Sequence, residues 1–385
     1  LKNISMKKKL YTAIGLMSGT SMDGVDLSII NSDGYHEFSN ILDNYYEYDK
    51  KLKDQLLQVR DLVLTKEDLS QNSEKLREME RNLTLFHAEA VKESLKKYKD
   101  RIDLVGFHGQ TILHNPREKI TIQLGDGKLL SQIIKKKVIY DFRQADIQNN
   151  GQGAPLTPIF HYILSKQINL NFNIEFPIGF LNIGGIANVT KVNNNSDNFQ
   201  NNLIAFDVGP GNCLIDEWVR NNSKQKFDEN GELAKSGKVD SLVLNQAIDN
   251  FNINSYSQSL DIKNFDVSFA RGLSLENGCA TITNFTAYLI SQGLKHISQK
   301  NSIIFLVCGG GRKNSNLINN IKNYLSDVNN INLDIIDNYN LNGDYIESQA
   351  FAFLAIRSFL NLPISFSTTT GCKEFTVGGK LVENF

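Results

Sequence analysis

The sequence has few of the residues on which extracellular, metal-binding or membrane proteins depend. Its four cysteines, Cys213, Cys279, Cys308 and Cys372, form no CxxC pair, so we expect reduced thiols rather than disulfides. The six histidines show no metal-ligand spacing such as HExxH. No apolar run reaches membrane-spanning length, and the stretch Ala13–Met17 is too short for a signal peptide. We therefore expect a cytoplasmic protein.

An excess of charge of one sign is also absent. The 41 Lys and Arg residues and 42 Asp and Glu residues leave a net charge of −1, which argues against a nucleic-acid or membrane-surface partner. We interpret the short basic run Lys7–Lys9 as a solvated leader. A hydrophobic content of 41% is typical of a globular protein, and the length of 385 residues predicts two domains with separate cores.

The stretch at residues 12–30, TAIGLMSGTSMDGVDLSII, organises our interpretation of the chain. An apolar strand at Ala13–Met17 leads into a turn rich in Gly, Ser, Thr and Asp, and an alternating strand follows at Val25–Ile30. Such a turn can aim backbone N–H groups and hydroxyls at an anion, because glycine lets the backbone approach closely. An ordinary hairpin with small turn residues explains the stretch equally well.

Strands that end in glycine turns recur in both halves of the chain. They are found at Ile102–Thr111, Phe180–Thr190, Leu203–Asn212 and Ile303–Asn314. The segment Asn149–Pro155, rich in Gly, Asn and Pro, is the strongest boundary signal between the halves. The repetition predicts a mixed α/β fold duplicated around a cleft, with ligands at the strand ends and in the gap between domains.

Helical periodicity marks most of the remaining chain. Residues Lys66–Lys99 predict one long helix or two in series, and Asn44–Asp54 reads as a connection. Further helices are predicted at Lys128–Ile134, Asn212–Arg220, Asp240–Asp249, Ser274–Ile297 and Tyr345–Leu360.

Two common nucleotide-binding motifs are missing. The sequence has no GxxxxGK[ST] loop and no GxGxxG opening a helix, which excludes a Walker loop and argues against a dinucleotide-binding unit. The remaining possibility is a set of short strand-borne turns that surround a polyphosphate from two sides.

Seven motifs in order resemble those of the anhydro-N-acetylmuramic acid kinases. They are GLMSGTSMDGVD (Gly15–Asp26), GFHGQT (Gly106–Thr111), DFRQADI (Asp141–Ile147), GQGAPLTP (Gly151–Pro158), NIGGIANVT (Asn182–Thr190), FDVGPGN (Phe206–Asn212) and CGGGRKN (Cys308–Asn314).

This resemblance covers most of the chain, and it implies a fold and a reaction. The implied fold is a two-domain actin/hexokinase-like (ribonuclease H-like) α/β fold with a central inter-domain cleft. We expect one domain at residues 1–146 plus 365–385 and the other at 147–364. The implied reaction uses ATP and Mg²⁺ to convert 1,6-anhydro-N-acetylmuramic acid to N-acetylmuramic acid 6-phosphate, in peptidoglycan recycling. The resemblance also implies a homodimer.

Opening a strained anhydro ring with water needs a base for the water and an O6 placed in line with the γ-phosphate. Asp207, at a strand end before Gly209-Pro210-Gly211, is our candidate base. The residue pattern alone allows Asp207 to be a cap of the following turn or helix instead. Glu347, at the start of the last long helix, is a candidate to orient or protonate the sugar, although a carboxylate there also suits the helix dipole.

Nucleotide contacts are expected from the glycine turns of both halves. The first turn would hold the β- and γ-phosphates, Gly184-Gly185 would approach the nucleotide, and Gly309–Gly311 would pass under the adenosine. The expected nucleotide-binding residues are Gly19, Thr20, Ser21, Met22, Asp23, Gly24, Val25, Asp26, Gly184, Gly185, Gly209, Gly309, Gly310, Gly311 and Asn314.

Sugar contacts are expected from His108, Gln110, Arg143, Asp146 and Gly151. A saccharide with an acetamido group and a lactyl carboxylate needs hydrogen-bond partners and a cation, and the guanidinium of Arg143 suits the carboxylate. His87, within the long helix, is interpreted as structural. The magnesium ligands are not identifiable from the sequence.

The chain departs from the family pattern at two places. Val208 stands where threonine is usual, and Thr368–Lys373 matches the family's ending only loosely. Two other functions stay open: a kinase of this fold for another sugar or a carboxylate, and an ATP-switched actin-like scaffold. The scaffold would have no need of Asp207 or of the Arg143–Asp146 pair.

Overall fold

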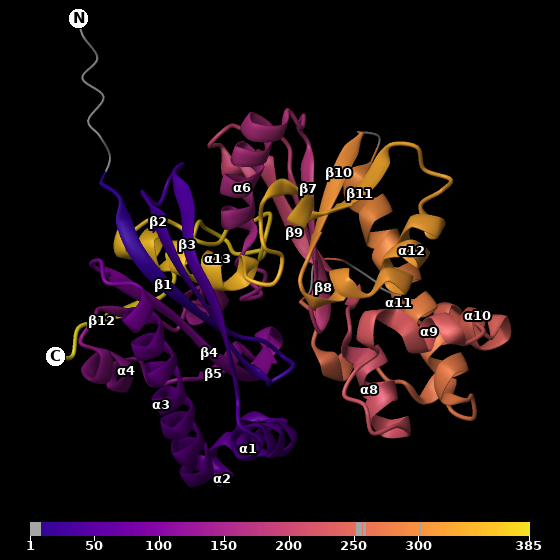
Figure 1. The fold of residues 1–385 in the computed structure, drawn as a ribbon, viewed down its shortest axis with the longest axis horizontal. Coiled ribbons are helices and arrows are strands. Elements are labelled where there is room, and N and C mark those ends of the chain that lie inside the picture. Colours follow the sequence, from indigo (N-terminus) through magenta and orange to yellow (C-terminus); the bar gives the residue numbers. More distant parts are fainter. Residues whose placement is uncertain (1–8, 252–255, 257–258, 300–301) are drawn as a thin grey trace, which may run out of the picture. The chain divides into compact units, whose positions relative to one another are not determined.

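The computed structural model describes residues 9–251, 256, 259–299 and 302–385 (Figure 1). Of the basic run at Lys7–Lys9, all but Lys9 lies outside the described residues. The chain divides into two compact units. The first comprises Leu1–Ile163, Glu347–Ser367 and Cys372–Phe385, and the second comprises Leu164–Ile346 and Thr368–Gly371.

The segment Asn149–Pro155, expected between domains, lies within the first unit. The chain passes to the second unit inside α6 (Pro158–Phe172) and returns at the start of α13 (Ile346–Phe359). The domain boundaries at 146/147 and 364/365 stay a prediction.

The first unit is built on a mixed sheet with strand order β12-β6-β4-β1-β2-β3, and β5 pairs with β4. The strands are β1 (Tyr11–Ser18), β2 (Gly24–Ser32), β3 (Phe38–Glu47), β4 (Leu104–Asn115), β5 (Ile120–Leu124), β6 (Val138–Tyr140) and β12 (Lys380–Val382). β1, β2 and β3 are antiparallel neighbours, while β4 runs parallel to β1 and β6 runs parallel to β4.

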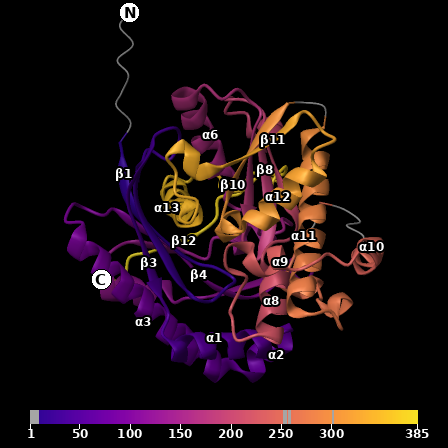
Figure 2. The ribbon, with the colours of Figure 1, turned by 45° about the vertical axis from the view of Figure 1, so that its right-hand side comes forward.

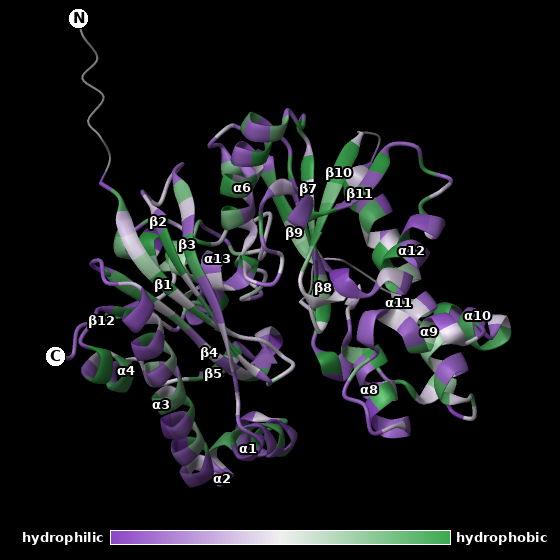
Figure 3. Ribbon diagram, in the orientation of Figure 1, coloured by the Kyte–Doolittle hydropathy of each residue, from purple (hydrophilic) through white to green (hydrophobic). Residues whose placement is uncertain are grey.

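The second unit has a five-stranded sheet with strand order β11-β10-β7-β8-β9. The strands are β7 (Ile178–Ile183), β8 (Ile186–Val192), β9 (Leu203–Pro210), β10 (Ile303–Cys308) and β11 (Ile331–Ile335). β7, β8 and β9 are antiparallel, and β10 and β11 add in parallel beside β7. Strands β7 and β10 are almost continuously apolar (Figure 3), because parallel strands within a sheet are covered on both faces.

Both units therefore share one topology, in which the strand order is third, second, first, fourth, fifth. β1, β2, β3, β4 and β6 of the first unit correspond to β7, β8, β9, β10 and β11 of the second. This order, with the first three strands antiparallel, is that of the ribonuclease H-like fold found in actin and hexokinase. The predicted fold class is confirmed, and so is the predicted duplication of a strand–turn–strand unit.

Each unit also contains helices. Those of the first unit are α1 (Lys50–Leu62), α2 (Lys66–Gln71), α3 (Ser73–Lys97), α4 (Gly127–Ile134), α5 (Gln144–Gln148) and most of α13. Those of the second are α7 (Phe199–Asn202), α8 (Cys213–Asn222), α9 (Glu232–Ser236), α10 (Ser241–Asn250), α11 (Leu275–Ser298) and α12 (Ser315–Tyr324). Among the helices of the described residues, none is both long and apolar enough to cross a bilayer.

Two glycines in strand interiors let helix α13 pack directly on the first sheet. Gly15 of β1 and Gly106 of β4 are paired across the strands. A Cβ at Gly15 would lie 1.9 Å from the carbonyl oxygen of Ser348, and one at Gly106 would lie 2.3 Å from that of Phe351. The alternate residues of β1 are buried in a core with α1 and α3, so the sheet lies between α13 and α3 (Figures 1 and 2).

The prediction of a connection over Asn44–Asp54 is wrong. Strand β3 extends to Glu47, and α1 begins at Lys50 with Asp49 as its N-cap, whose carboxylate accepts from the N–H of Leu52 at 2.7 Å. β3 lies at the edge of the sheet and most of its residues are exposed or only partly buried, so it lacks the alternation of buried and exposed residues that a half-buried strand shows. Of the two alternatives over Lys66–Lys99, one long helix or two in series, the structure has the second, as α2 and α3.

Candidate active site

The first glycine turn joins β1 to β2 and is held by its neighbours. The side-chain N–H of Gln110 donates to the carbonyl oxygen of Gly19 at 3.0 Å, and the N–H of Met22 closes the turn onto the same oxygen at 3.2 Å. Met22 has a left-handed backbone with φ of 52° and a buried side chain. The hydroxyl of Ser21 donates to the carboxylate of Asp23 at 2.7 Å. These contacts give the turn a defined shape.

His108, in the middle of β4, and Arg143, the residue before α5, form a polar pair. The guanidinium of Arg143 donates to Nε2 of His108 at 3.1 and 2.9 Å, and its NH1 donates to the carbonyl oxygen of Gly153 at 2.7 Å. Nδ1 of His108 lies 2.7 Å from a carbonyl oxygen, which only accepts, so this nitrogen carries the proton. Burial and the charge of Arg143 hold the pKa of His108 well below its ordinary value. His108 is therefore a neutral acceptor for Arg143.

Asp146 lies under the loop that follows α5. Its carboxylate accepts from the N–H of Gly153 at 2.7 Å and from the hydroxyl of Ser365 at 2.6 Å. A Cβ at Gly151 would lie 2.1 Å from Oδ2 of Asp146, so the loop can close over the carboxylate only with glycine there. These contacts make Asp146 and Gly151 determinants of the loop's position next to Arg143.

Glu347 lies in the first turn of α13, as expected, and in the first unit together with Arg143. Burial raises the pKa of this carboxyl, while the positive charge of Arg143 lowers it. A carboxyl with a raised pKa can hold a proton for delivery to a leaving oxygen.

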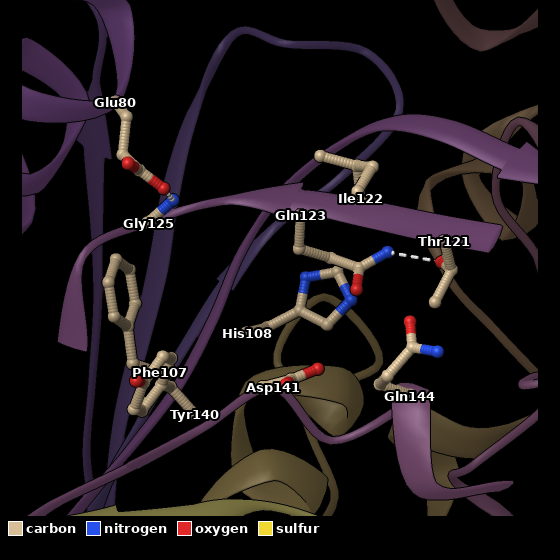
Figure 4. Close-up of a pocket in the computed structure, with 10 residues that line it drawn as sticks. All are labelled: Glu80, Phe107, His108, Thr121, Ile122, Gln123, Gly125, Tyr140, Asp141 and Gln144. Atoms are coloured by element: carbon tan, nitrogen blue, oxygen red, sulfur yellow. Dashed lines mark hydrogen bonds between the residues drawn. The ribbon is translucent and has the colours of Figure 1, made fainter. Parts of the chain in front are cut away.

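A cavity of about 290 Å³ opens beside His108 in the first unit (Figure 4). Its lining includes Glu80, Thr121, Gln123 and Asp141. The carboxylate of Glu80 accepts from the N–H of Gly125 at 3.1 Å, and burial raises its pKa. The side-chain N–H of Gln123 donates to the hydroxyl of Thr121 at 2.7 Å. The predicted sugar residue His108 therefore borders a cavity lined by hydrogen-bonding groups and by apolar side chains such as Phe107 and Ile122.

Asp207 lies near the end of β9 in the second unit and is only 7% exposed. Its Oδ2 accepts from the backbone N–H of Leu260 at 2.7 Å. The N-cap of α8 is Asn212, so Asp207 does not cap that helix. The β-ladder is irregular here, since Ala187 pairs with Gly209 and the next pair is Asn188 with Asp207.

Val208, between these pairs, has no exposed surface. A Cβ at Gly293 of α11 would lie 2.3 Å from its Cγ1, so the helix packs on this side chain. An apolar residue at position 208 fits this buried place.

The Gly184-Gly185 turn joins β7 to β8 and is the counterpart of the first turn. The carbonyl oxygen of Gly184 accepts from the N–H of Asn212 at 2.8 Å. That of Gly185 accepts from the N–H groups of Gly211 at 2.9 Å and Cys213 at 3.2 Å. The turn is thus fixed by backbone groups at the start of α8. Gly209, a predicted nucleotide-binding residue, lies near the end of β9, just before these groups.

The triglycine segment, Gly309–Gly311, follows β10. The protein's own conformation and packing require glycine at two of its positions. Gly309 has φ of 78°, and a Cβ at Gly311 would lie 2.2 Å from the side chain of Ile183. Asn314 caps α12 by accepting from the N–H of Leu317 at 2.9 Å. The predicted contact of Asn314 with nucleotide stays a prediction beside this structural role.

Gly19, Gly184 and Gly310 share a property that sets them apart from such packing glycines. A Cβ at these positions would meet its nearest protein atom at 3.8, 3.6 and 4.0 Å respectively, and none of the three has a left-handed backbone. Neither packing nor conformation therefore requires glycine there. A ligand that approaches the backbone closely would require it.

The structure divides the predicted residues between the two units. The first unit holds Gly19–Asp26, His108, Gln110, Arg143, Asp146, Gly151 and Glu347, and the second holds Gly184, Gly185, Asp207, Gly209, Gly309–Gly311 and Asn314. Sequence reasoning missed Tyr48 and Arg312, whose side chains hold the first turn and the triglycine segment. Arg312 lies within the CGGGRKN motif, and this position next to the three glycines could have indicated its role. Nothing in the sequence singles out Tyr48.

Comparisons with known proteins agree with the resemblance. The chain matches the family described as anhydro-N-acetylmuramic acid kinase over residues 11–384. The protein of that name from Pelagibacter ubique (strain HTCC1062) is 53% identical over 385 residues, which are 98% of this chain and 100% of the relative. Its namesake from Brucella suis (strain ATCC 23445 / NCTC 10510) is 37% identical over 378 residues, 96% of this chain and 98% of the relative.

A solved structure, the activator of the 2-hydroxyisocaproyl-CoA dehydratase from Clostridium difficile with bound ADPNP, has a TM-score of 0.43 to this chain. It is 12% identical and covers 91% of this chain and 96% of its own.

Proposed function

The chain belongs to the anhydro-N-acetylmuramic acid kinase family, and we propose that it opens 1,6-anhydro-N-acetylmuramic acid with water and phosphorylates O6 at the expense of ATP. The products are N-acetylmuramic acid 6-phosphate and ADP. The enzyme is a phosphotransferase with an alcohol group as acceptor, and it serves the recycling of cell-wall sugar in the cytoplasm. A homodimer is the proposed assembly.

The observation that supports nucleotide binding most strongly is the set of open glycines, Gly19, Gly184 and Gly310. Each lies in the segment directly after a strand and is at least partly exposed, and successive backbone N–H groups in such segments can bind an anion. Polyphosphate and ribose approach a backbone more closely than a Cβ allows. We propose that the first turn and the Gly184-Gly185 turn bind phosphates and that Gly310 lies under the adenosine.

Asp207 is the proposed general base. It accepts a proton from water as the water oxygen attacks C1, and the C1–O6 bond breaks. The released O6 forms a bond to the γ-phosphorus, whose bond to the bridging oxygen breaks as ADP leaves. The hydrogen bond from Leu260 holds the carboxylate at a fixed angle, which favours proton transfer along one direction.

The sugar is the proposed ligand of the polar groups in the first unit. The guanidinium of Arg143, held by His108 and Gly153, provides positive charge for the lactyl carboxylate. Oε1 of Gln110 is buried and has no hydrogen-bond partner among the described residues, so a sugar hydroxyl or amide would satisfy it. Glu347 is proposed to orient the sugar or to protonate it, in accord with its raised pKa.

Mg²⁺ is the proposed metal cofactor. The described residues contain no cluster of three or more His, Cys, Asp or Glu side chains suited to a metal ion. Magnesium is commonly held by one or two carboxylates together with substrate phosphates, so it does not need a cluster of three protein ligands. Asp23, in the first turn, provides a carboxylate of the required kind.

The test is an incubation with ATP, Mg²⁺ and the anhydro sugar in ¹⁸O-labelled water. We expect a product with the mass of N-acetylmuramic acid 6-phosphate and one labelled oxygen at C1. Asp207→Asn serves as the control for contaminating kinases. Phosphorylation of ordinary hexoses or of a carboxylate at a higher rate than the anhydro sugar would favour the other kinase, and ATP-dependent assembly without sugar turnover would favour a scaffold.

A further inference from the structure

Tyr48, which follows β3, holds both ends of the first glycine turn. Its phenolic oxygen lies 2.8 Å from the hydroxyl oxygen of Ser18, the residue before the turn. Its backbone N–H donates to the carbonyl oxygen of Asp23, the last residue before β2, at 2.8 Å. Tyr48 is 4% exposed, and its ring packs edge-on against Phe86 of α3 with 4.9 Å between ring centres. One rigid residue therefore bridges the two strands where they enter and leave the turn.

His87 of α3 fixes the direction of the hydrogen bonds. Its Nδ1 lies 2.8 Å from the carbonyl oxygen of Leu83, which can only accept, so Nδ1 carries the proton. Burial lowers the pKa of His87 to about 4, so the ring is neutral and its Nε2 is an acceptor. Nε2 lies 3.1 Å from the hydroxyl of Ser18, which must donate to it. The Tyr48 hydroxyl then donates to Ser18. The series of hydrogen bonds therefore runs from Tyr48 to Ser18, from Ser18 to His87 and from His87 to Leu83.

This direction decides what the turn can offer to an anion. The single proton of the Ser18 hydroxyl is committed to His87, so that hydroxyl cannot donate to a phosphate. Donors for phosphate must then come from the residues after Ser18. Their orientation depends on the two ends that Tyr48 joins.

The counterpart turn in the second unit shows why side chains are needed here. The β7–β8 turn has only Gly184 and Gly185 between its strands, and backbone N–H groups of residues 211–213 hold it. The β1–β2 turn has five residues, Gly19–Asp23, and a longer loop has more conformations to restrict. Besides the backbone hydrogen bonds from Met22 to Gly19 and from Tyr48 to Asp23, its anchors are the side chains of Tyr48, Ser18 and Gln110.

We propose that Tyr48 is a positioning residue for the nucleoside triphosphate, acting through Ser18 and through the ends of the turn. The proposal rests on the proposed function of this turn as a phosphate site. The Tyr48 hydroxyl aligns the turn's donors with the phosphates and does not itself touch them.

Tyr48→Phe is the test, with Tyr46→Phe as the matched control. The hydroxyl of Tyr46, in β3, also bonds to α3, at 2.8 Å from the hydroxyl of Ser94, and this hydrogen bond includes no residue of the turn or of its two ends. Both variants lose one phenol hydrogen bond and should lose similar thermal stability. We expect Tyr48→Phe alone to raise the KM for ATP about five- to tenfold, the usual effect of one lost hydrogen bond, while the KM for sugar is unchanged.

Ser18→Ala should give a similar increase, and adding Tyr48→Phe to it should have little further effect because the two act through one contact. Equal KM values for ATP in Tyr48→Phe and Tyr46→Phe, measured on folded protein, would overturn the proposal. Gly19→Ala separates the two levels of inference. If Gly19→Ala weakens ATP binding and Tyr48→Phe does not, the positioning role fails alone, and if neither does, the turn is not the phosphate site.

Discussion

The carboxylate of Asp207 is bound to the backbone of Leu260, whose N–H donates to Oδ2 at 2.7 Å. The two residues are 53 positions apart, so the contact ties the end of β9 to a distant segment of the same unit. A base held in this way has one orientation, and its strand allows little movement. The contact also suggests how to remove the base without removing the fold.

Asp207→Asn should slow turnover severely while the protein stays folded. An amide oxygen can still accept from Leu260, but the amide cannot take a proton from water. We expect kcat to fall by about 10²–10⁴-fold, the usual effect of losing a general base, with ATP and sugar affinity retained. Measuring kcat and the thermal midpoint on one sample checks this. A destabilised variant with full kcat would remove Asp207 as the base and direct attention to Glu347.

Gly184→Ala should weaken ATP binding without loss of stability. The new Cβ would have its nearest protein atom, the carbonyl oxygen of Ile186, at 3.6 Å, so the protein accommodates it. A bound phosphate would not. Gly211→Ala is the contrast, because its Cβ would lie 2.1 Å from the carbonyl oxygen of Gly184 and should lower the thermal midpoint. Calorimetric titration with a non-hydrolysable ATP analogue measures the first effect, and wild-type affinity in Gly184→Ala would argue against a phosphate at this turn.

The buried histidines should make the protein sensitive to acid. The pKa of His87 and of His114 is lowered to about 4, chiefly by burial, whereas an unfolded histidine titrates near 6.5. The unfolded state therefore binds more protons between these values, so the stability present above pH 6.5 is lost as the pH falls toward 4. Glu80 and Glu347 have raised pKa values and act in the opposite direction.

His87→Asn isolates one contribution, since its amide can still donate to the carbonyl oxygen of Leu83. Urea unfolding at pH 7.5 and pH 4.5 should show a smaller loss of stability for His87→Asn than for wild type. The difference has an upper limit of about 3 kcal/mol. An identical pH dependence in both proteins would show that His87 does not titrate in this range.

Much of the fold could be predicted from sequence because its strands and glycine turns leave local signals. Apolar runs such as Ile303–Cys308 end at glycines, and the helices carry clear periodicity. Edge strand β3 was missed because its residues, most of them exposed or partly buried, show no alternation of apolar and polar positions to detect. Gly15 and Gly106 were not recognised as helix-packing positions, since the close approach of α13 is a contact between segments more than 200 residues apart.

Candidate site residues with polar or charged side chains could be selected from motifs. The sequence could not show which of them bind a ligand and which hold the fold. Asp146 and Asn314 have partners within the fold that only the structure shows. Tyr48 could not be found because its function depends on where β3 and α3 bring its hydroxyl. Glycines were all selected alike, and only the surroundings distinguish Gly310 from Gly311.

Arg312 supports the triglycine segment, and its replacement should weaken nucleotide binding. The guanidinium is buried and donates to both oxygens of Asp337, at 2.7 and 3.0 Å. It also donates to Asp344 at 2.6 Å and to the carbonyl oxygen of Gly309 at 3.1 Å. The two carboxylates raise its pKa, and in return its charge lowers the pKa of each. The segment is thus tied to the loop that precedes α13.

Arg312→Lys keeps the charge but loses the planar fork that reaches three partners at once. We expect the KM for ATP to rise about tenfold through loosening of Gly309–Gly311, with a lower thermal midpoint. Lys313→Gln is the control, because within the described part of the chain Lys313 makes only an exposed ion pair with Asp344, and such pairs contribute about 0–1 kcal/mol. Steady-state kinetics with varied ATP distinguishes the two variants. Equal KM values for Arg312→Lys and wild type would mean that the segment holds its shape without this network, and that nucleotide affinity depends on the glycines alone.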